Sequence, residues 1–370
     1  MKILVLTSRY TATRDIIGED FGRQTRLFSA LRKLNHEIDF FVADYRKLED
    51  KKTKLHRINV TIVPFSISHF FGFLKRLDTQ LKSKKYDFVI ASSDPLWGII
   101  GYIIAKRNNA KFVYDLHDNY ETYSTYKIPF FKYMDNAVLR KADLVTTVSH
   151  TLMDKIKSIR KDKVFVIQNG VDTNIFRPMD KPKCRKALNL PQNAKIIVYT
   201  GSIQRLQGIN LLVEAFKVLK KYFNNLRLVI AGRFVRGEEN KISLNHDGII
   251  YLKSLTQENV AKLVNASDVA VIPNPENNFT KYCFPYKLVE YMACNANIVA
   301  TDVGDVGLFL KNFKGSLCKE NDVNDMIAKI NFQLNKKKNA GKTDYRQFAM
   351  KNSWENIATH LDKILRANAK

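Results

Sequence analysis

Short runs of β-branched and aromatic residues alternate with longer amphipathic segments along this 370-residue chain. Such alternation is typical of parallel sheets whose crossover helices cover both faces. The fold class that it predicts is α/β, with two Rossmann-like, doubly wound parallel-sheet domains. The strands are expected at residues 3–6, 38–42, 60–63, 88–91, 112–115, 144–148 and 164–167, and then at residues 196–200, 228–231, 249–252, 269–272 and 298–301.

Chain length and loop signals predict two domains. At about 150 residues per domain, 370 residues are enough for two cores. Prolines and charges at residues 176–193 are typical of a linker around a short helix. We therefore expect domains at residues 1–182 and 190–352, and a closing helix at 353–370 that packs back on the first domain. The lysine-rich residues 335–342 are expected to form a solvated loop.

The chain is strongly basic, with a formal net charge of +25. The excess is shared between the halves, because residues 1–180 carry 31 lysines and arginines against 20 acidic residues, and residues 181–370 carry 30 against 16. A solvated lysine-rich surface and a contact with an anionic partner both account for this charge. No zinc-finger, helix-turn-helix or RNP-like pattern is present, so a nucleic-acid partner is not expected.

The cysteines and the hydropathy pattern indicate the compartment. The four cysteines form no CxxC pair, which argues against a zinc knuckle or a disulfide framework and favours a reducing compartment. The apolar run at the N-terminus is too short for a signal peptide. The longest apolar run, residues 96–105, is far below the roughly 20 residues of a spanning helix. We expect a cytoplasmic protein, and the basic charge is compatible with a peripheral place on the inner face of the membrane.

The segment 285–301 predicts a helix followed by a short buried strand. Lys287 and Glu290 share one face of this helix, because residues three apart are neighbours. Pro285 suits the first turn, where its missing N–H costs nothing. A cation and a carboxylate near a helix start, beside free backbone amides, suit a phosphate and a sugar diol respectively. The pair therefore predicts a nucleotide-sugar site.

A loop bracketed by Gly201 and Gly208 follows the strand at 196–200 and precedes an amphipathic helix. In an open α/β sheet, ligands sit at the carboxyl ends of strands, where such a loop offers amides to a phosphate and Arg205 adds charge. The alternative is that both glycines only permit tight turns.

Together these segments resemble the GT-B glycosyltransferases of the large retaining family 4, also called glycosyl transferases group 1. The donor domain of that family starts with a glycine loop of this length and carries a Lys-Leu-x-Glu-Tyr-Met-Ala segment like residues 287–293. Residues 166–178 resemble the family's connector almost residue for residue. The resemblance covers essentially the whole chain and implies two domains that face a cleft.

The resemblance implies a retaining glycosyltransferase that moves a sugar from a nucleoside-diphosphate sugar, its co-substrate, to an acceptor hydroxyl, with no other cofactor and no metal. By this resemblance, Glu290 would bind the ribose hydroxyls, while Arg205 and Lys287 would face the diphosphate. The expected donor-binding residues are Gly18, Gly201, Arg205, Gln207, Gly208, Lys287, Leu288 and Glu290.

Two departures from the family pattern concern this site. The family usually has arginine directly after the first loop glycine and lysine just before the second, where this chain has Ser202 and Gln207. Arg205 replaces at most one of these charges. The first of the family's paired glutamates would fall at Tyr282. Members with a Pro-x-Lys-Leu segment often show the same loss, so activity is still expected.

In the first half, His117 and Asp118 follow the strand at 112–115 and are expected to point at the interdomain cleft. A neutral imidazole there can bind a sugar hydroxyl or assist a proton transfer, and the family often has a histidine or His-Asp at this point. Both residues are catalytic candidates, and the alternative is a structural histidine. Gly18 resembles part of the family's glycine loop near the reaction centre, whereas His36 is expected to be a structural turn residue.

Residues 65–85 interleave aromatic side chains with cations, which suits the surface of an anionic membrane. An ordinary loop and core helix is the alternative. With a membrane contact, the acceptor would belong to cell-surface polysaccharide, glycolipid or lipid-linked oligosaccharide synthesis. Two other functions stay open: a GT-B-like protein that binds or epimerises nucleotide sugars without transfer, and a basic nucleic-acid-binding protein.

Overall fold

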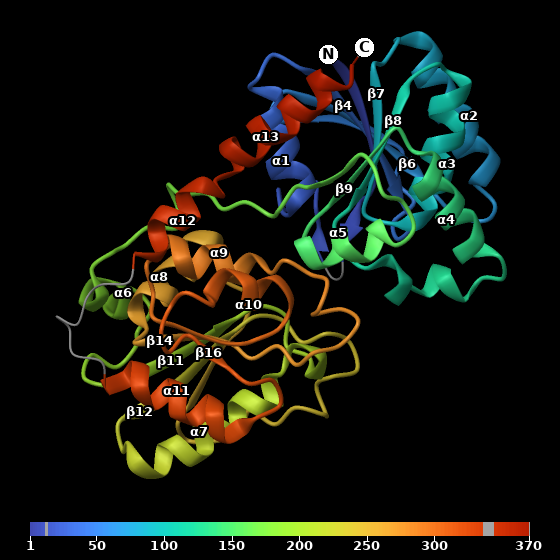
Figure 1. Cartoon of the computed structure of the whole chain (residues 1–370). Helices are drawn as coiled ribbons and strands as arrows, with labels where there is room; N and C mark the ends of the chain where they lie inside the picture. Colours follow the sequence, from blue (N-terminus) through green and yellow to red (C-terminus); the bar gives the residue numbers. More distant parts are fainter. Residues whose placement is uncertain (12–13, 336–343, 370) are drawn as a thin grey trace. The chain divides into compact units, whose positions relative to one another are not determined.

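The computed structural model describes residues 1–11, 14–335 and 344–369, in two compact units (Figure 1). Unit 1 contains Met1–Asn169 and Trp354–Lys370, and unit 2 contains Gly170–Ser353. The predicted solvated loop at 335–342 lies, apart from its first residue, outside the described residues.

Unit 1 is built on an eight-stranded sheet in the order β10-β9-β8-β7-β1-β4-β6-β5. Seven of its strands are parallel, and they form where apolar runs were predicted. Their bounds are β1 Lys2–Ser8, β4 Glu37–Asp44, β6 Ile58–Pro64, β7 Phe88–Ser92, β8 Lys111–Leu116, β9 Leu144–Thr147 and β10 Val164–Val166, while β5 Lys51–Leu55 pairs antiparallel with β6. Figure 1 shows α1 (Arg23–Arg32) and α13 (Trp354–Ala367) on one face of this sheet. The other face carries α2 Phe70–Ser83, α3 Pro95–Arg107 and α4 Phe131–Lys141.

Unit 2 contains a six-stranded sheet in the order β13-β12-β11-β14-β15-β16, with every pair parallel. The strands are β11 Lys195–Thr200, β12 Leu226–Ala231, β13 Ile249–Leu252, β14 Val269–Ile272, β15 Ile298–Thr301 and β16 Leu317–Cys318. The helices are α6 Lys181–Ala187, α7 Ile209–Tyr222, α8 Gln257–Ala266, α9 Tyr286–Ala293, α10 Gly304–Leu310, α11 Val323–Asn335 and α12 Tyr345–Lys351. The side chains of α7 and α11 bury one sheet face in a continuous apolar core.

The division between the units falls between Asn169 and Gly170, before the proline-rich segment in which we expected the linker. Residues 170–182 therefore belong to unit 2. The backbone N–H of Val171 donates to the carbonyl of Asn352 (3.0 Å), and α6 packs against α8. Arg185 of α6 also binds Asp268 at 2.9 Å, which fixes the short helix to unit 2.

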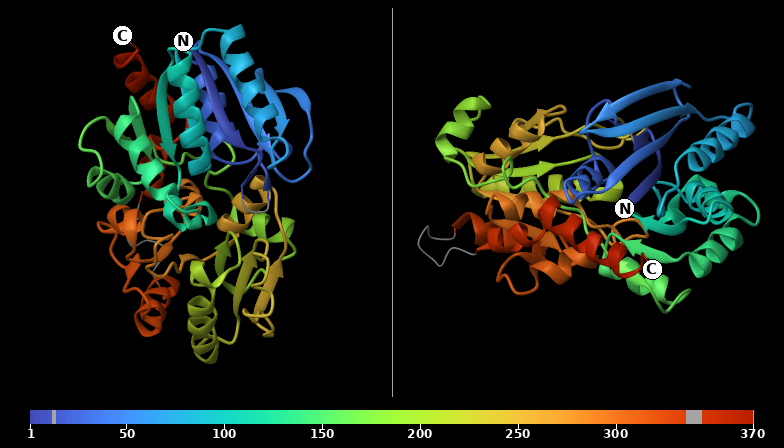
Figure 2. Two further views of the ribbon diagram at one scale, coloured as in Figure 1. Left: turned by 90° about the vertical axis from the view of Figure 1, so that its right-hand side faces the viewer. Right: turned by 90° about the horizontal axis from the view of Figure 1, so that it is seen from above.

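The C-terminal helix α13 belongs to unit 1, where it packs against α1 (Figure 2). Its apolar stripe, which includes Trp354, Leu361 and Leu365, is buried. His36, the expected turn residue, is buried and lies 2.7 Å from Asp362 of this helix. The chain thus enters unit 2 and returns to complete unit 1.

Short or polar strands are not predicted by the hydrophobic pattern of the sequence. These are β5, the hairpin strands β2 Tyr10–Thr11 and β3 Arg14–Asp15, and β16. The strand β5 reads Lys-Lys-Thr-Lys-Leu, with the charged residues that protect an exposed sheet edge from pairing with other chains. All four cysteines are free thiols. Within the described ranges, no helix has the length and apolarity to cross a bilayer.

Candidate functional site

The loop after β11 brings several predicted residues to the carboxyl edge of the unit 2 sheet. Gly201 directly follows β11 with φ 134°, and Gly208 directly precedes α7 with φ 76°. A Cβ at Gly208 would lie 1.7 Å from the carbonyl oxygen of Pro273, so only glycine allows this loop to touch the end of β14. Since no side chain caps α7, its first backbone amides point out of the helix at this edge.

Lys287 of α9 reaches into this loop and is 7% exposed. Its ammonium donates to Gln207 Oε1 (3.1 Å) and to the hydroxyl of Tyr199 (3.3 Å), and it lies 4.3 Å from the centre of the Tyr199 ring. Burial lowers the pKa of Lys287 to about 8, against the opposing charges of Cys283 and Glu290. Both hydrogen-bond partners are neutral, so this cation is desolvated without a bound carboxylate.

Glu290 follows Lys287 by three residues on α9 and is half-buried. The next residue, Tyr291, fixes the helix to the end of β11, because its hydroxyl accepts the backbone N–H of Thr200 at 2.9 Å. The helix, its cation and the glycine loop therefore form one rigid arrangement. A diphosphate placed against the loop amides would meet Lys287 within it.

The structure places two predicted donor residues elsewhere. The Arg205 side chain is 54% exposed and pairs with Glu238, whose Oε2 also accepts the Arg205 backbone N–H at 2.9 Å. Leu288 is fully buried in the core of unit 2. Among the loop and helix residues, the structure therefore brings together Gly201, Gln207, Gly208 and Lys287.

Two residues of this edge were missed by the sequence analysis. Tyr199 faces Lys287 from the end of β11. Asn274 follows β14 and is 1% exposed, and neither polar atom of its side chain has a hydrogen-bond partner within the described residues. Unpaired buried amides are costly, so Asn274 is a candidate ligand contact. Its position just beyond a predicted parallel strand was the available signal.

In unit 1, the loop that contains Gly18 is held by its own side chains. The backbone N–H groups of Ile17 and Gly18 donate to Asp15 Oδ1 at 3.1 and 2.9 Å. Asp15 in turn pairs with Arg9 at 2.8 Å. The amide of Gly18 is therefore already used within the loop.

His117 follows β8 at the carboxyl edge of the unit 1 sheet. The backbone N–H of Ser93 donates to its Nδ1 at 3.2 Å, and the Tyr120 hydroxyl lies 3.0 Å from the same nitrogen, an arrangement that favours the proton on Nε2. Burial lowers the pKa of His117 to about 4; Arg23 lowers it further and Asp115 opposes the shift. The imidazole is consequently neutral at neutral pH and can donate a hydrogen bond through Nε2.

Asp118 has the opposite shift, because burial raises the pKa of its carboxyl to about 7. The backbone N–H of Asn119 donates to it at 2.8 Å and partly opposes this effect. A carboxyl that titrates near neutral pH is suited to accept and return a proton. At neutral pH the imidazole of His117 is therefore neutral, whereas the carboxyl of Asp118, in the same loop, is close to its pKa.

A buried ion pair supports this loop from below. Arg23, the first residue of α1, donates to both carboxylate oxygens of Asp115 at 2.9 and 3.2 Å. Ser92 and Thr146 donate to the same carboxylate at 2.9 and 2.7 Å. Arg23 also donates to the backbone carbonyl of Gln168 at 3.0 Å, which ties α1 to the end of unit 1. No pattern in the sequence predicts this network.

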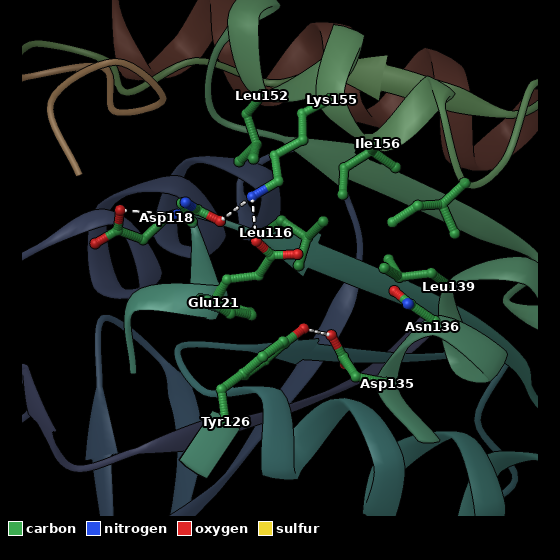
Figure 3. A pocket seen from close by; sticks show the side chains of 13 residues that line it. Leu116, Asp118, Glu121, Tyr126, Asp135, Asn136, Leu139, Leu152, Lys155 and Ile156 are labelled. Carbon is green, nitrogen blue, oxygen red and sulfur yellow. Dashed lines mark hydrogen bonds and ion pairs between the residues drawn. The ribbon is translucent and has the colours of Figure 1, made fainter. Parts of the chain in front are cut away.

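A pocket opens beside Asp118, between the loop after β8 and the helices α4 and α5 (His150–Lys157) (Figure 3). Its empty space is about 310 Å³, including the open mouth. Lys155 crosses one side and donates to Asn119 (2.9 Å) and Glu121 (2.7 Å). Leucines and isoleucines line it together with these groups, so the pocket combines charged side chains that are paired with one another with apolar side chains.

Two family models match the chain. The model described as Glycosyltransferase Family 4 matches residues 25–175, and the model described as Glycosyl transferases group 1 matches residues 180–350. An uncharacterized glycosyltransferase of Methanocaldococcus jannaschii is 23% identical over 341 residues, which cover 89% of this chain and 90% of that relative.

Solved structures share the fold. Sucrose-phosphate synthase from Thermosynechococcus elongatus has a TM-score of 0.79 at 18% identity, over 99% of this chain and 98% of that chain. Anabaena HepE in complex with UDP has a TM-score of 0.79 at 18% identity, over 99% and 100%. HepE has also been solved with UDP-glucose, and with UDP and glucose. These similarities confirm the predicted α/β class with two Rossmann-like domains.

Proposed function

Because this chain belongs to the GT-B glycosyltransferases that join a Family 4 half to a group 1 half, we propose that it transfers a sugar from a nucleoside-diphosphate sugar to an acceptor hydroxyl with retention of the anomeric configuration. The acceptor in this proposal belongs to cell-surface polysaccharide, glycolipid or lipid-linked oligosaccharide synthesis. UDP is the donor nucleotide to test first, because HepE is described with UDP and UDP-glucose.

The observation that carries the proposal is the buried ammonium of Lys287. It lies among neutral partners at the carboxyl edge of a parallel sheet, beside a glycine loop and an uncapped helix start. A desolvated cation there gains more from a diphosphate than an exposed one, since the local dielectric is low. Gln207 holds the ammonium in place, and Glu290 accepts hydrogen bonds from the ribose hydroxyls.

In this proposal the bond between the anomeric carbon and the diphosphate oxygen breaks while the acceptor oxygen bonds to the same face of that carbon. The acceptor proton passes to the leaving diphosphate, so no protein base is needed, and attack on the same face needs no protein nucleophile. Negative charge grows on the diphosphate, and Lys287 with the α7 amides stabilises it. His117 donates through Nε2 to a sugar hydroxyl, and Asp118 hydrogen-bonds a sugar hydroxyl without taking the acceptor proton.

The experiment is a measurement of nucleoside-diphosphate release by the full chain, with UDP-, GDP-, ADP- and dTDP-sugars and a membrane extract as acceptor source. We expect release with one donor that depends on the extract, and Glu290→Gln should lower donor affinity about tenfold by weakening hydrogen bonds to the sugar diol. Glu276→Gln, on a half-exposed residue paired with Lys281, is the matched control. Donor binding without turnover would favour a binding or epimerising protein, and absence of donor binding would contradict the proposal.

A further inference from the structure

Large apolar side chains are exposed at the start of two helices of unit 1. Ile67, just before α2, is 98% exposed, and Phe71 on its first turn is 81% exposed. Just before and within α4, Phe130 is 82% and Tyr133 is 73% exposed, and Ile128 is 53% exposed. We call these five side chains the apolar rim. Single exposed apolar residues are common on protein surfaces, but such a group marks an interaction site.

The apolar rim differs from the membrane segment that the sequence pattern predicted at residues 65–85. Phe73, Leu77 and Leu81 of that segment are buried, and Phe65 packs edge-on against Phe73 and Trp97. These residues form part of the core of unit 1, as the alternative interpretation, an ordinary loop and core helix, predicts. Ile67 and Phe71 remain exposed, and the residues before α4 join them although the sequence analysis did not single them out.

Both parts of the apolar rim lie on one side of unit 1. The helices α2 and α4 cover the same face of the sheet with α3 between them (Figure 1). Each helix ends shortly before a parallel strand, α2 before β7 and α4 before β9, so both end near the amino edge of the sheet and begin toward its carboxyl edge. Their first turns are therefore presented toward the same edge of the same face.

Phe130 is held in an unfavourable conformation for an aromatic residue. Its φ is 61°, in the left-handed region that costs a residue with a Cβ about 1 kcal/mol. No burial offsets this cost, because the ring is 82% exposed. A strained and exposed phenylalanine points to a function outside the folding of the isolated chain.

Cations are interleaved with the apolar rim. Lys75 lies four residues after Phe71, on the same side of α2, and Lys127 and Lys132 flank the residues before α4. All three lysines are exposed. Rings and aliphatic side chains with lysines beside them match the boundary between acyl chains and anionic headgroups. A soluble acidic partner would use the charges but would leave the apolar side chains unexplained.

We propose that unit 1 docks on an anionic membrane surface through the apolar rim, with Phe71 and Phe130 inserted among the acyl chains and Lys75, Lys127 and Lys132 at the headgroups. This docking does not depend on the donor site of unit 2. It would present a lipid-borne acceptor to the loop that carries His117 and Asp118 in the same unit.

The test is sedimentation of the full chain with phosphatidylcholine vesicles, with and without phosphatidylglycerol. We expect binding to the anionic vesicles only, and about tenfold weaker partitioning for Phe130→Asn and for Phe71→Ser, because each loses the burial of one ring. Asparagine tolerates the left-handed conformation, so Phe130→Asn keeps the fold. Tyr222→Ser removes a side chain of unit 2 that is 78% exposed and should partition like the unchanged chain.

Equal partitioning of the unchanged chain and both rim variants would overturn the inference, as would equal binding to neutral and anionic vesicles. A dimer in solution that Phe130→Asn converts to a monomer would assign the apolar rim to a second copy instead. UDP binding is measured in the same samples. We expect it to be unchanged in the rim variants, so a failure of membrane docking is distinguished from a failure of the donor site.

Discussion

Two buried cations, one in each unit, have different kinds of hydrogen-bond partner. Arg23 in unit 1 has a buried carboxylate as its partner, and Asp115 also accepts hydrogen bonds from Ser92 and Thr146. Lys287 in unit 2 is buried among a glutamine, a tyrosine hydroxyl and a tyrosine ring. The first cation is neutralised within the fold, and the second is not.

The difference is what we expect between a structural cation and a cation that binds a ligand. Burial alone would raise the pKa of Asp115, but Arg23 and the hydroxyl donors outweigh it and hold that pKa below its usual value. Cys283 and Glu290 support the charge of Lys287 too weakly to offset its burial, and its pKa falls to about 8. A desolvated charge costs folding free energy, and an anionic ligand returns that free energy on binding.

The largest expected effect is a loss of stability when Arg23, the paired cation, is replaced. Arg23→Met leaves the buried Asp115 carboxylate without its counter-charge, and removal of one partner of a buried pair costs about 3–5 kcal/mol of unfolding free energy. Urea unfolding followed by circular dichroism measures this loss. A loss below about 1 kcal/mol, the range of surface ion pairs, would show that the pair does not hold unit 1 together.

The unpaired cation should behave in the opposite way. Lys287→Met keeps the length of the side chain and removes the buried charge, so thermal unfolding should stay at the same temperature or move higher. Affinity for UDP should fall about 30-fold or more, since hydrogen bonds to a charged group are worth about 2 kcal/mol. Isothermal titration calorimetry measures the affinity, with Lys281→Met, a half-exposed lysine paired with Glu276, as the control. A large drop in unfolding temperature with unaltered UDP binding would make Lys287 a structural residue.

The pKa of Lys287 predicts a pH dependence of UDP binding. The ammonium is largely charged at pH 7 and loses its proton as the pH rises through about 8. UDP affinity should therefore fall by up to about tenfold per pH unit above this value, with the midpoint moved upward by the bound anion. Calorimetric titrations from pH 7 to pH 10 test this, and Lys287→Met should remove the dependence. A constant affinity over that range in the unchanged chain would argue against contact between the ammonium and the diphosphate.

The smallest effect is expected at Arg205. Its guanidinium is exposed and paired with Glu238, so Arg205→Ala should change UDP affinity less than about threefold, as is usual for an exposed ion pair. The same calorimetric experiment measures it. A loss as large as that of Lys287→Met would restore Arg205 as the diphosphate ligand expected from the sequence and would show that the loop rearranges on binding.

The sequence predicted the parallel strands well, because each central strand is an apolar run bounded by turn residues. It did not predict β5, since Lys51, Lys52 and Lys54 give this edge strand the composition of a loop. The linker was predicted at residues 176–193 around a short helix, and α6 lies in that range, where it tolerates a proline in its first turn and packs on α8.

The sequence also identified Lys287, Gln207 and the two loop glycines that the structure brings together. It did not show which charged side chains would form ion pairs away from the site. Arg205 pairs with Glu238, which lies 33 residues further along the chain, and the periodicity of the sequence does not predict such a pairing. Asn274 and the Arg23–Asp115 pair were missed for the same reason, because their significance lies in burial and partners rather than in spacing.

The position of α13 has a consequence for synthesis of the chain. Residues 170–353 leave the ribosome before Trp354–Lys370, which unit 1 needs to cover α1. Domains usually complete their folding in the order in which they are translated. Here the second unit can finish while the first still waits for its final helix, so a chain truncated before residue 354 would carry a complete unit 2 attached to an unfinished unit 1.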